Sequence, residues 1–149
     1  MTSLHQRLGP WLELLRWNKP TGRLILLIPA GWTLWLSPSA PPSTTLLLQI
    51  VIGGLAVSGA GCVANDLWDR RFDSRVERTK RRPLARGAIG IGSALTLLLL
   101  MLVLSLAVVL SLDAGSLQLC LLLAVLALPP ILLYPAAKRG FAYPQASRA

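Results

Sequence analysis

Charged residues are confined to three parts of the chain, and long apolar stretches separate them. No charged residue lies between Arg23 and Asp66, from residue 87 to 112, or from residue 114 to 137. A helix of about 20 apolar residues crosses ~30 Å of hydrocarbon, and a helix satisfies its own backbone hydrogen bonds in lipid. The pattern predicts an all-α membrane protein, a bundle with four transmembrane helices at residues 21–36, 44–64, 88–112 and 117–134.

Polar and apolar positions alternate differently before the first of these spans. In residues 4–17, leucines and a tryptophan recur roughly on one face while Arg7, Glu13 and Arg16 lie mostly elsewhere. This spacing predicts an amphipathic helix at the membrane interface. The second span is rich in glycine, alanine and serine, which let helices approach closely in lipid. Pro129 and Pro130 are expected to bend or end the fourth span.

The charge changes the picture by giving the bundle an orientation. The chain has 149 residues with 15 Lys and Arg against 6 Asp and Glu, a formal net charge of +9. All fifteen basic residues fall on one side of the four-span arrangement, which the positive-inside rule makes cytoplasmic, with both termini inside. The bilayer therefore accounts for the charge, and nucleic acid is excluded as a partner.

Three carboxylates follow the second span directly. Asp66, Asp69 and Asp73 are spaced i, i+3, i+7, so they share one face if the helix continues past Ala64. Carboxylate oxygens suit Mg²⁺, which binds through a few carboxylates together with substrate phosphates. The arginines interleaved with them have the donor geometry that phosphate oxygens require. The spacing therefore indicates a site for Mg²⁺ and a diphosphate at the membrane surface.

An ordinary interpretation of the same residues stays open on spacing alone. Aspartates and arginines beside a membrane span are commonly solvated ion pairs that fix topology or contact anionic lipid. On that interpretation the chain is a non-catalytic membrane protein. The single histidine and the two cysteines inside apolar segments exclude a zinc site in either case.

Four segments resemble one family. The sequence NDLWDRRFD, residues 65–73, resembles the first aspartate-rich motif, N-D-x-x-D-x-x-x-D, of the UbiA-type intramembrane aromatic prenyltransferases. VERTKRRPLARG at residues 76–87, RWNKPTGRLILLIPAGW at 16–32 and YPAAKRGFAYPQ at 134–145 are similar to segments of the branch that acts on 4-hydroxybenzoate. The four matches stand in the family's order.

The resemblance implies a fold, a reaction and a set of site residues. Such enzymes have about nine helices and transfer a polyprenyl group from its diphosphate to an aromatic acid, as in quinone biosynthesis. By resemblance Asp66, Asp69 and Asp73 are the catalytic, Mg²⁺-binding residues, and Arg23 is a candidate contact for the aromatic substrate. The implied diphosphate contacts are Asn65, Arg78, Lys80, Arg82, Lys138 and Arg139.

The chain departs from the family in its second half. Family members are nearly twice as long and carry a second motif, D-x-x-x-D, whereas Asp113 is the only acidic residue after Glu77 here. We therefore expect residues 1–149 to be the N-terminal part of a single prenyltransferase domain, inactive by itself. The acceptor also stays open, because homogentisate, chlorophyllide and haem enzymes share the family's plan.

Overall fold

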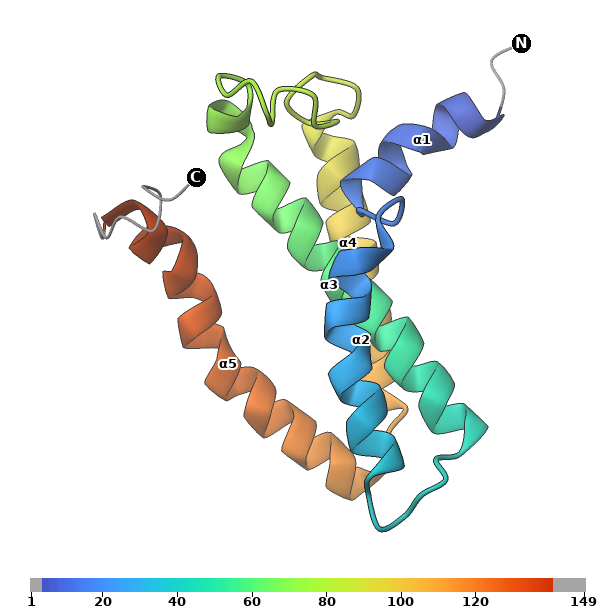
Figure 1. The fold of residues 1–149 in the computed structure, drawn as a ribbon. Helices are drawn as coiled ribbons and strands as arrows, with labels where there is room; N and C mark the ends of the chain where they lie inside the picture. The colour runs from blue at the N-terminus through green and yellow to red at the C-terminus, as the bar shows by residue number, and fades with distance from the viewer. Residues whose placement is uncertain (1–3, 141–149) are drawn as a thin grey trace. The chain divides into compact units, whose positions relative to one another are not determined.

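The chain folds entirely into helices over the part that the structure describes. A computed structural model describes residues 4–140, with the side chains of 8–19, 21–127 and 129. The helices are α1 (Leu4–Leu14), α2 (Pro20–Trp35), α3 (Thr44–Asp73), α4 (Ile91–Leu110) and α5 (Ala114–Gly140) (Figure 1). No strand occurs within residues 4–140. The prediction of an all-α fold is confirmed.

Two helices are long and apolar enough to cross a membrane, namely α3 and α4. Helix α2 has 16 residues, and the apolar part of α5 extends over Ala114–Ala127. On α4, Leu99 and Leu100 are 61% and 57% exposed, as expected of side chains that face lipid. The four-span topology stays a prediction, and the structure supplies the helices from which it would be built.

Helix α3 is longer than the span that the sequence predicts. It begins after Ser43, whose hydroxyl accepts a hydrogen bond from the backbone N–H of Leu46 at 3.2 Å, and it ends only at Asp73. Eight of the last nine residues, beyond Ala64, are polar or aromatic, and all nine continue the same helix. Asp66, Asp69 and Asp73 therefore do lie on one helix, as their spacing requires.

Helix α1 ends at Leu14, three residues before the predicted end, because the chain reverses there. Arg16 has a φ of 56°, in the left-handed region. The backbone N–H of Trp17 donates to the carbonyl of Leu12 at 2.8 Å, and that of Arg16 to Glu13 at 3.0 Å. This pair of bonds is the Schellman motif, in which glycine usually occupies the left-handed position. The reversal leads directly into α2.

The core lies where the end of α1 meets α3 and the α3–α4 connection, residues 74–90. Its buried members come from all three segments and the start of α4: Leu14, Leu15, Val63, Leu84, Ile89 and Ala94. The apolar face predicted for an interfacial helix is thus partly used inside the protein. Leu8 and Leu12, in contrast, are exposed. The core holds the connection against α1.

Small residues of α3 are points of close packing, as predicted. A Cβ atom at Gly54 would lie 2.9 Å from Leu27 on α2, and one at Gly53 would lie 3.1 Å from Val108 on α4. At Gly59 it would lie 2.9 Å from Leu15 and 3.5 Å from the sulfur of Met101. At Gly61 nothing lies within 4 Å. Close approach therefore explains three of these glycines and not the fourth.

Leucine at position 59 should destabilise the fold, whereas leucine at position 61 should be tolerated. We expect Gly59→Leu to lower the free energy of unfolding by about 1–3 kcal/mol, because the added side chain overlaps Leu15 and Met101. Gly61→Leu adds the same volume to the same helix in open space. Thermal or SDS-induced unfolding in detergent measures both. Equal effects at the two positions would contradict the packing described here.

Helix α5 belongs to a second compact unit, residues 109–149, which is described by itself. Asp113 caps its first turn by accepting a hydrogen bond from the backbone N–H of Ser116 at 3.0 Å, and this bond lowers the pKa of the carboxyl. The helix continues through Pro129 and Pro130 to Gly140. Of the two outcomes predicted for these prolines, a bend or an end, the end does not occur.

Candidate functional site

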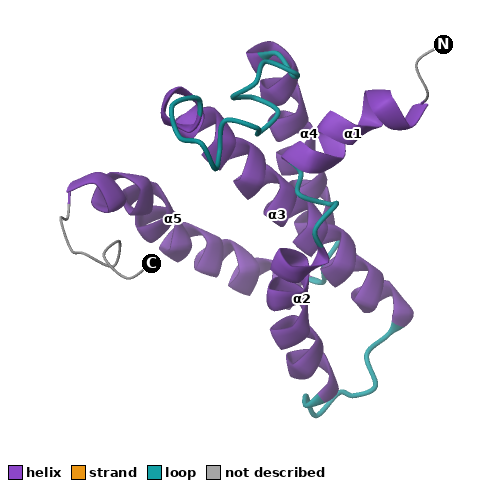
Figure 2. Cartoon of the chain, turned by 45° about the horizontal axis from the view of Figure 1, so that its top comes forward, coloured by secondary structure: helices purple, strands orange, loops and turns teal. Residues whose placement is uncertain are grey.

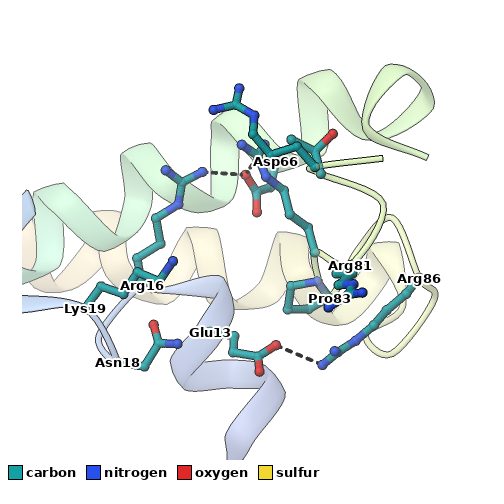
Figure 3. Close-up of a pocket in the computed structure, with 11 residues that line it drawn as sticks. Glu13, Arg16, Asn18, Lys19, Asp66, Arg81, Pro83 and Arg86 are labelled. Atoms are coloured by element: carbon teal, nitrogen blue, oxygen red, sulfur yellow. Dashed lines mark hydrogen bonds and ion pairs between the residues drawn. The ribbon is translucent and has the colours of Figure 1, made fainter. Parts of the chain in front are cut away.

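A cavity of about 450 Å³ opens between the end of α1, the α1–α2 turn, α3 and the α3–α4 connection (Figure 3). The connection is a loop throughout (Figure 2). Most of the lining side chains are charged or polar. They are Glu13, Arg16, Asn18, Lys19, Asp66, Arg78, Thr79, Arg81, Arg82, Pro83 and Arg86. Six of these side chains are cationic and two are anionic, so the cavity attracts anions.

Asp66 forms the inner wall of this cavity and is only 2% exposed. Its Oδ1 accepts hydrogen bonds from Arg16 Nη2 at 3.0 Å and from Arg82 Nη1 at 3.1 Å. Figure 3 shows Arg16 reaching Asp66 from the turn after α1. A buried carboxylate requires such partners, because removing it from water without them is costly. Two segments far apart in sequence thus meet at this one side chain.

Asp73 lies two turns farther along α3 and shares one of these partners. Its Oδ2 accepts from Arg82 Nη1 at 2.6 Å, and it is 7% exposed. The buried Thr79 hydroxyl donates to the backbone carbonyl of Asp73 at 3.2 Å, which fixes the loop against the helix end. Asp66 and Asp73 therefore face the same guanidinium, as an i, i+7 spacing allows. Their repulsion is relieved by arginine, in pairs whose carboxylates are buried while the guanidinium side chains stay partly exposed.

The third predicted metal ligand, Asp69, and the predicted diphosphate contact Asn65 are not part of this cluster. Asp69 is half-buried and Asn65 is exposed, and of the three aspartates only Asp66 lines the cavity. Over the residues whose side chains are described, no three Asp, Glu, His or Cys residues gather closely enough to hold a metal ion. Asp66 Oδ1 and Asp73 Oδ2 nevertheless both contact the same atom, Arg82 Nη1. That pair fits Mg²⁺, which needs one or two carboxylates when substrate phosphates complete its coordination.

Some of the predicted basic residues line the cavity, and others do not. Arg78 and Arg82 line the cavity. Lys80 is exposed and pairs with Glu77 at 2.7 Å instead. Arg23 donates a hydrogen bond through Nη2 to the backbone carbonyl of Trp17. The side chains of Lys138 and Arg139 lie outside the described residues.

Two buried donors lie close together in sequence, one in the α1–α2 turn and one in the first turn of α2. Arg23 Nε and Trp17 Nε1 are buried and have no hydrogen-bond acceptor among the described residues. A buried N–H group without an acceptor costs free energy, so an acceptor that reached either nitrogen, water included, would stabilise it.

Sequence reasoning missed four of the cavity's cationic residues. Arg16, Lys19, Arg81 and Arg86 lie within the segments that carry the family resemblance, yet nothing in their local pattern marks them. Arg86 Nη2 pairs with Glu13 at 2.8 Å and thereby ties the connection to α1. Only the packing of α1 on the connection reveals these contacts.

Arg16 has a strained backbone, and this strain can be measured. Both Arg16→Ala and Arg16→Gly remove the ion pair with Asp66, but only glycine fits a φ of 56° without penalty. We expect the glycine variant to be more stable than the alanine variant by about 1 kcal/mol. At Arg75, whose φ is not positive, the order should reverse. Chemical or thermal unfolding of the four variants tests this, and an alanine advantage at both positions would contradict it.

Comparison with known proteins shows which family the chain belongs to. The profile of the UbiA prenyltransferase family matches residues 26–147. The chain is 48% identical over 138 residues to the 4-hydroxybenzoate solanesyltransferase of Synechocystis sp., an alignment that covers 91% of this chain and 46% of the relative. It is 40% identical over 144 residues to the 4-hydroxybenzoate octaprenyltransferase of Nitrosospira multiformis, covering 97% and 48%.

A more distant relative is covered to the same extent. The 4-hydroxybenzoate octaprenyltransferase of Coxiella burnetii is 34% identical over 145 residues, which cover 97% of this chain and 49% of that protein. The chain thus spans about half the length of the curated relatives it matches. No solved structure matches it. With the match to the family over most of its residues, and with two helices apolar enough to span a bilayer, the chain belongs to the UbiA prenyltransferase family of membrane proteins.

Proposed function

We propose that the cavity binds the diphosphate of a polyprenyl diphosphate, and that the chain takes part in transferring the polyprenyl group to 4-hydroxybenzoate. The observation that carries this proposal is the set of six cationic side chains around a cavity whose inner wall is a buried aspartate. Guanidinium groups match phosphate oxygens in geometry and charge. The printed names of the relatives, 4-hydroxybenzoate solanesyl- and octaprenyltransferases, support the same reaction.

Mg²⁺ is the proposed cofactor. Asp66 and Asp73 would hold it, with Asp69 and Asn65 nearby on the same helix. The ion would supply positive charge to the departing diphosphate. Carboxylates at the end of a span would place this chemistry at the membrane surface, where a lipid substrate presents its head group.

The chain's own cations then act on the leaving group. Arg78 and Arg82 line the cavity and would donate to the phosphate oxygens, which stabilises the negative charge that develops as the carbon–oxygen bond breaks. Lys80, Lys138 and Arg139 are proposed as further contacts. Arg16 and Lys19 extend the same cationic wall from the α1–α2 turn.

Arg23 is the proposed contact for the carboxylate of the aromatic acid. Arg23 Nε and Trp17 Nε1 are buried donors on two residues that a hydrogen bond joins, and a carboxylate is an acceptor for such donors. The arrangement favours an acidic aromatic acceptor over a neutral one. The bundle would stand in the inner membrane with both termini and the α3–α4 connection on the cytoplasmic side, since the connection is the most basic part of the chain.

Binding of a labelled short-chain prenyl diphosphate to the chain in nanodiscs tests the proposal. We expect saturable binding that requires Mg²⁺ and that inorganic pyrophosphate displaces. Arg78→Gln should weaken it about tenfold, the effect of one charge-assisted hydrogen bond. Arg75→Gln removes the same charge from an exposed position outside the cavity and should change little.

The competing interpretation predicts a different pattern. A non-catalytic membrane protein that contacts anionic lipid would bind the label without Mg²⁺, and acidic vesicles would displace it as well as pyrophosphate does. Equal losses in Arg78→Gln and Arg75→Gln would also favour that interpretation. The transfer step is tested by adding 4-hydroxybenzoate and analysing the products by mass spectrometry. Since residues 1–149 are expected to be inactive by themselves, product formation that Asp66→Asn abolishes would overturn that expectation.

A further inference from the structure

Arg82 stands at a point where two buried carboxylates converge. Its Nη1 is 3.1 Å from Asp66 Oδ1 and 2.6 Å from Asp73 Oδ2. The two aspartate side chains are 3% and 10% exposed, whereas that of Arg82 is 27% exposed and also lines the cavity. Arg82 Nη1 thus lies where a cation shared by the two carboxylates would lie. The Arg82 side chain also reaches the cavity.

We propose that Arg82 is an exchangeable counter-ion. It neutralises Asp66 and Asp73 when no metal is bound, and it moves onto the diphosphate when a divalent ion takes its place between them. This inference rests on the proposed function and adds a coupling to it. The metal and the diphosphate bind together because each changes what Arg82 can pair with.

Charge balance around the two aspartates is the physical reason. Asp66 and Asp73 are matched by Arg16 and Arg82, so this group is neutral. A divalent ion added beside both arginines would leave excess positive charge next to two buried carboxylates, which is unfavourable. A diphosphate brings several negative charges and gives the displaced guanidinium new acceptors. Metal alone should therefore bind weakly, and metal with diphosphate strongly.

Backbone hydrogen bonds hold residue 82 in place, so that only the Arg82 side chain moves in the exchange. The backbone N–H of Arg82 donates to Thr79 at 3.0 Å, and its carbonyl accepts from Arg86 at 2.9 Å. Thr79 is bonded to the end of α3, and Arg86 is paired with Glu13 on α1. The backbone at residue 82 is thus held on both sides, while an arginine side chain has several rotatable bonds through which its guanidinium can turn.

Manganese binding to the chain in nanodiscs tests the exchange, with Mn²⁺ followed by electron paramagnetic resonance and inorganic pyrophosphate as the second ligand. In the unaltered chain, pyrophosphate should tighten Mn²⁺ binding ~10-fold or more, and Mn²⁺ should tighten pyrophosphate binding by the same factor. Arg82→Gln should bind Mn²⁺ alone several-fold more tightly than the unaltered chain, with most of the coupling lost. Arg75→Gln is the matched control and should retain both values.

Equal Mn²⁺ affinity and equal coupling in Arg82→Gln and Arg75→Gln would overturn the inference while leaving the diphosphate site in place. Absence of Mn²⁺ binding to the unaltered chain, even with pyrophosphate, would instead overturn the proposed function. Thermal unfolding adds a second readout, since Mn²⁺ should raise the Tm of Arg82→Gln more than that of the unaltered chain. If Arg82→Gln does not fold alone, its recovery on adding Mn²⁺ supports the exchange, and failure to recover contradicts it.

Discussion

Asn in place of Asp66 should weaken Mg²⁺-dependent diphosphate binding by about 30-fold or more, the consequence of losing 2 kcal/mol or more at a buried charged group. The change keeps the size of the side chain but removes the charge that faces Arg16 and Arg82. It also removes one of the two carboxylates proposed to hold the metal. Isothermal titration of Mg²⁺–pyrophosphate into the chain in nanodiscs measures the effect.

Glu77→Gln is the control for Asp66→Asn. It removes one carboxylate from the same region, but Glu77 is exposed, pairs only locally with Lys80 and lies outside the cavity. We expect its diphosphate affinity to match that of the unaltered chain. If Asp66→Asn bound Mg²⁺–pyrophosphate as tightly as Glu77→Gln does, the aspartate would have a structural role alone and the proposed metal site would be wrong.

Methionine in place of Arg82 should lower the free energy of unfolding by about 3 kcal/mol, at the lower end of the range for broken buried ion pairs. Asp73 would lose its ion pair with Arg82, and Asp66 would keep its ion pair with Arg16. Thermal unfolding in detergent measures the loss. Arg75→Met provides the comparison, since Arg75 is exposed and should change stability by no more than about 0.5 kcal/mol.

A combined variant separates the charge from the packing at this position. With Asp66 and Asp73 both changed to Asn, the further change Arg82→Met should cost far less than it does alone, because no buried carboxylate is then left without a counter-ion. An unchanged cost would mean that Arg82 stabilises the fold through its aliphatic stem rather than through its ion pairs.

The sequence predicted the helices well and their ends poorly. Stretches without charge mark where helices must lie if they cross a bilayer, and each of the four predicted spans overlaps one helix, although the bounds differ. Hydropathy says nothing about where a helix ends once it leaves the apolar layer. Helix α3 therefore runs nine residues past its predicted end, and α1 ends early because Arg16 adopts a left-handed backbone that nothing in its sequence pattern announces.

Helical periodicity predicted that Asp66 and Asp73 share a face, because that relation depends only on the repeat of one helix. It did not predict which basic side chains would reach them. Arg82 and Lys80 are two residues apart in the same motif, yet one turns to the aspartates and the other to Glu77. Loop turns decide that difference. The contacts of Arg16 and Arg86 span 50 and 73 residues and arise only from tertiary packing.

Together with the backbone, these ion pairs form a closed ring of contacts, and this has one more consequence. The chain can be followed from Glu13 through the α1 turn to Arg16, across to Asp66, on to Arg82 in the connection, and through Arg86 back to Glu13. In such a ring, one ion pair can break while the others still hold α1, α3 and the α3–α4 connection together. We expect the mouth of the cavity to widen on one side at a time, so that the proposed diphosphate could enter while the connection stays attached to α1 and α3.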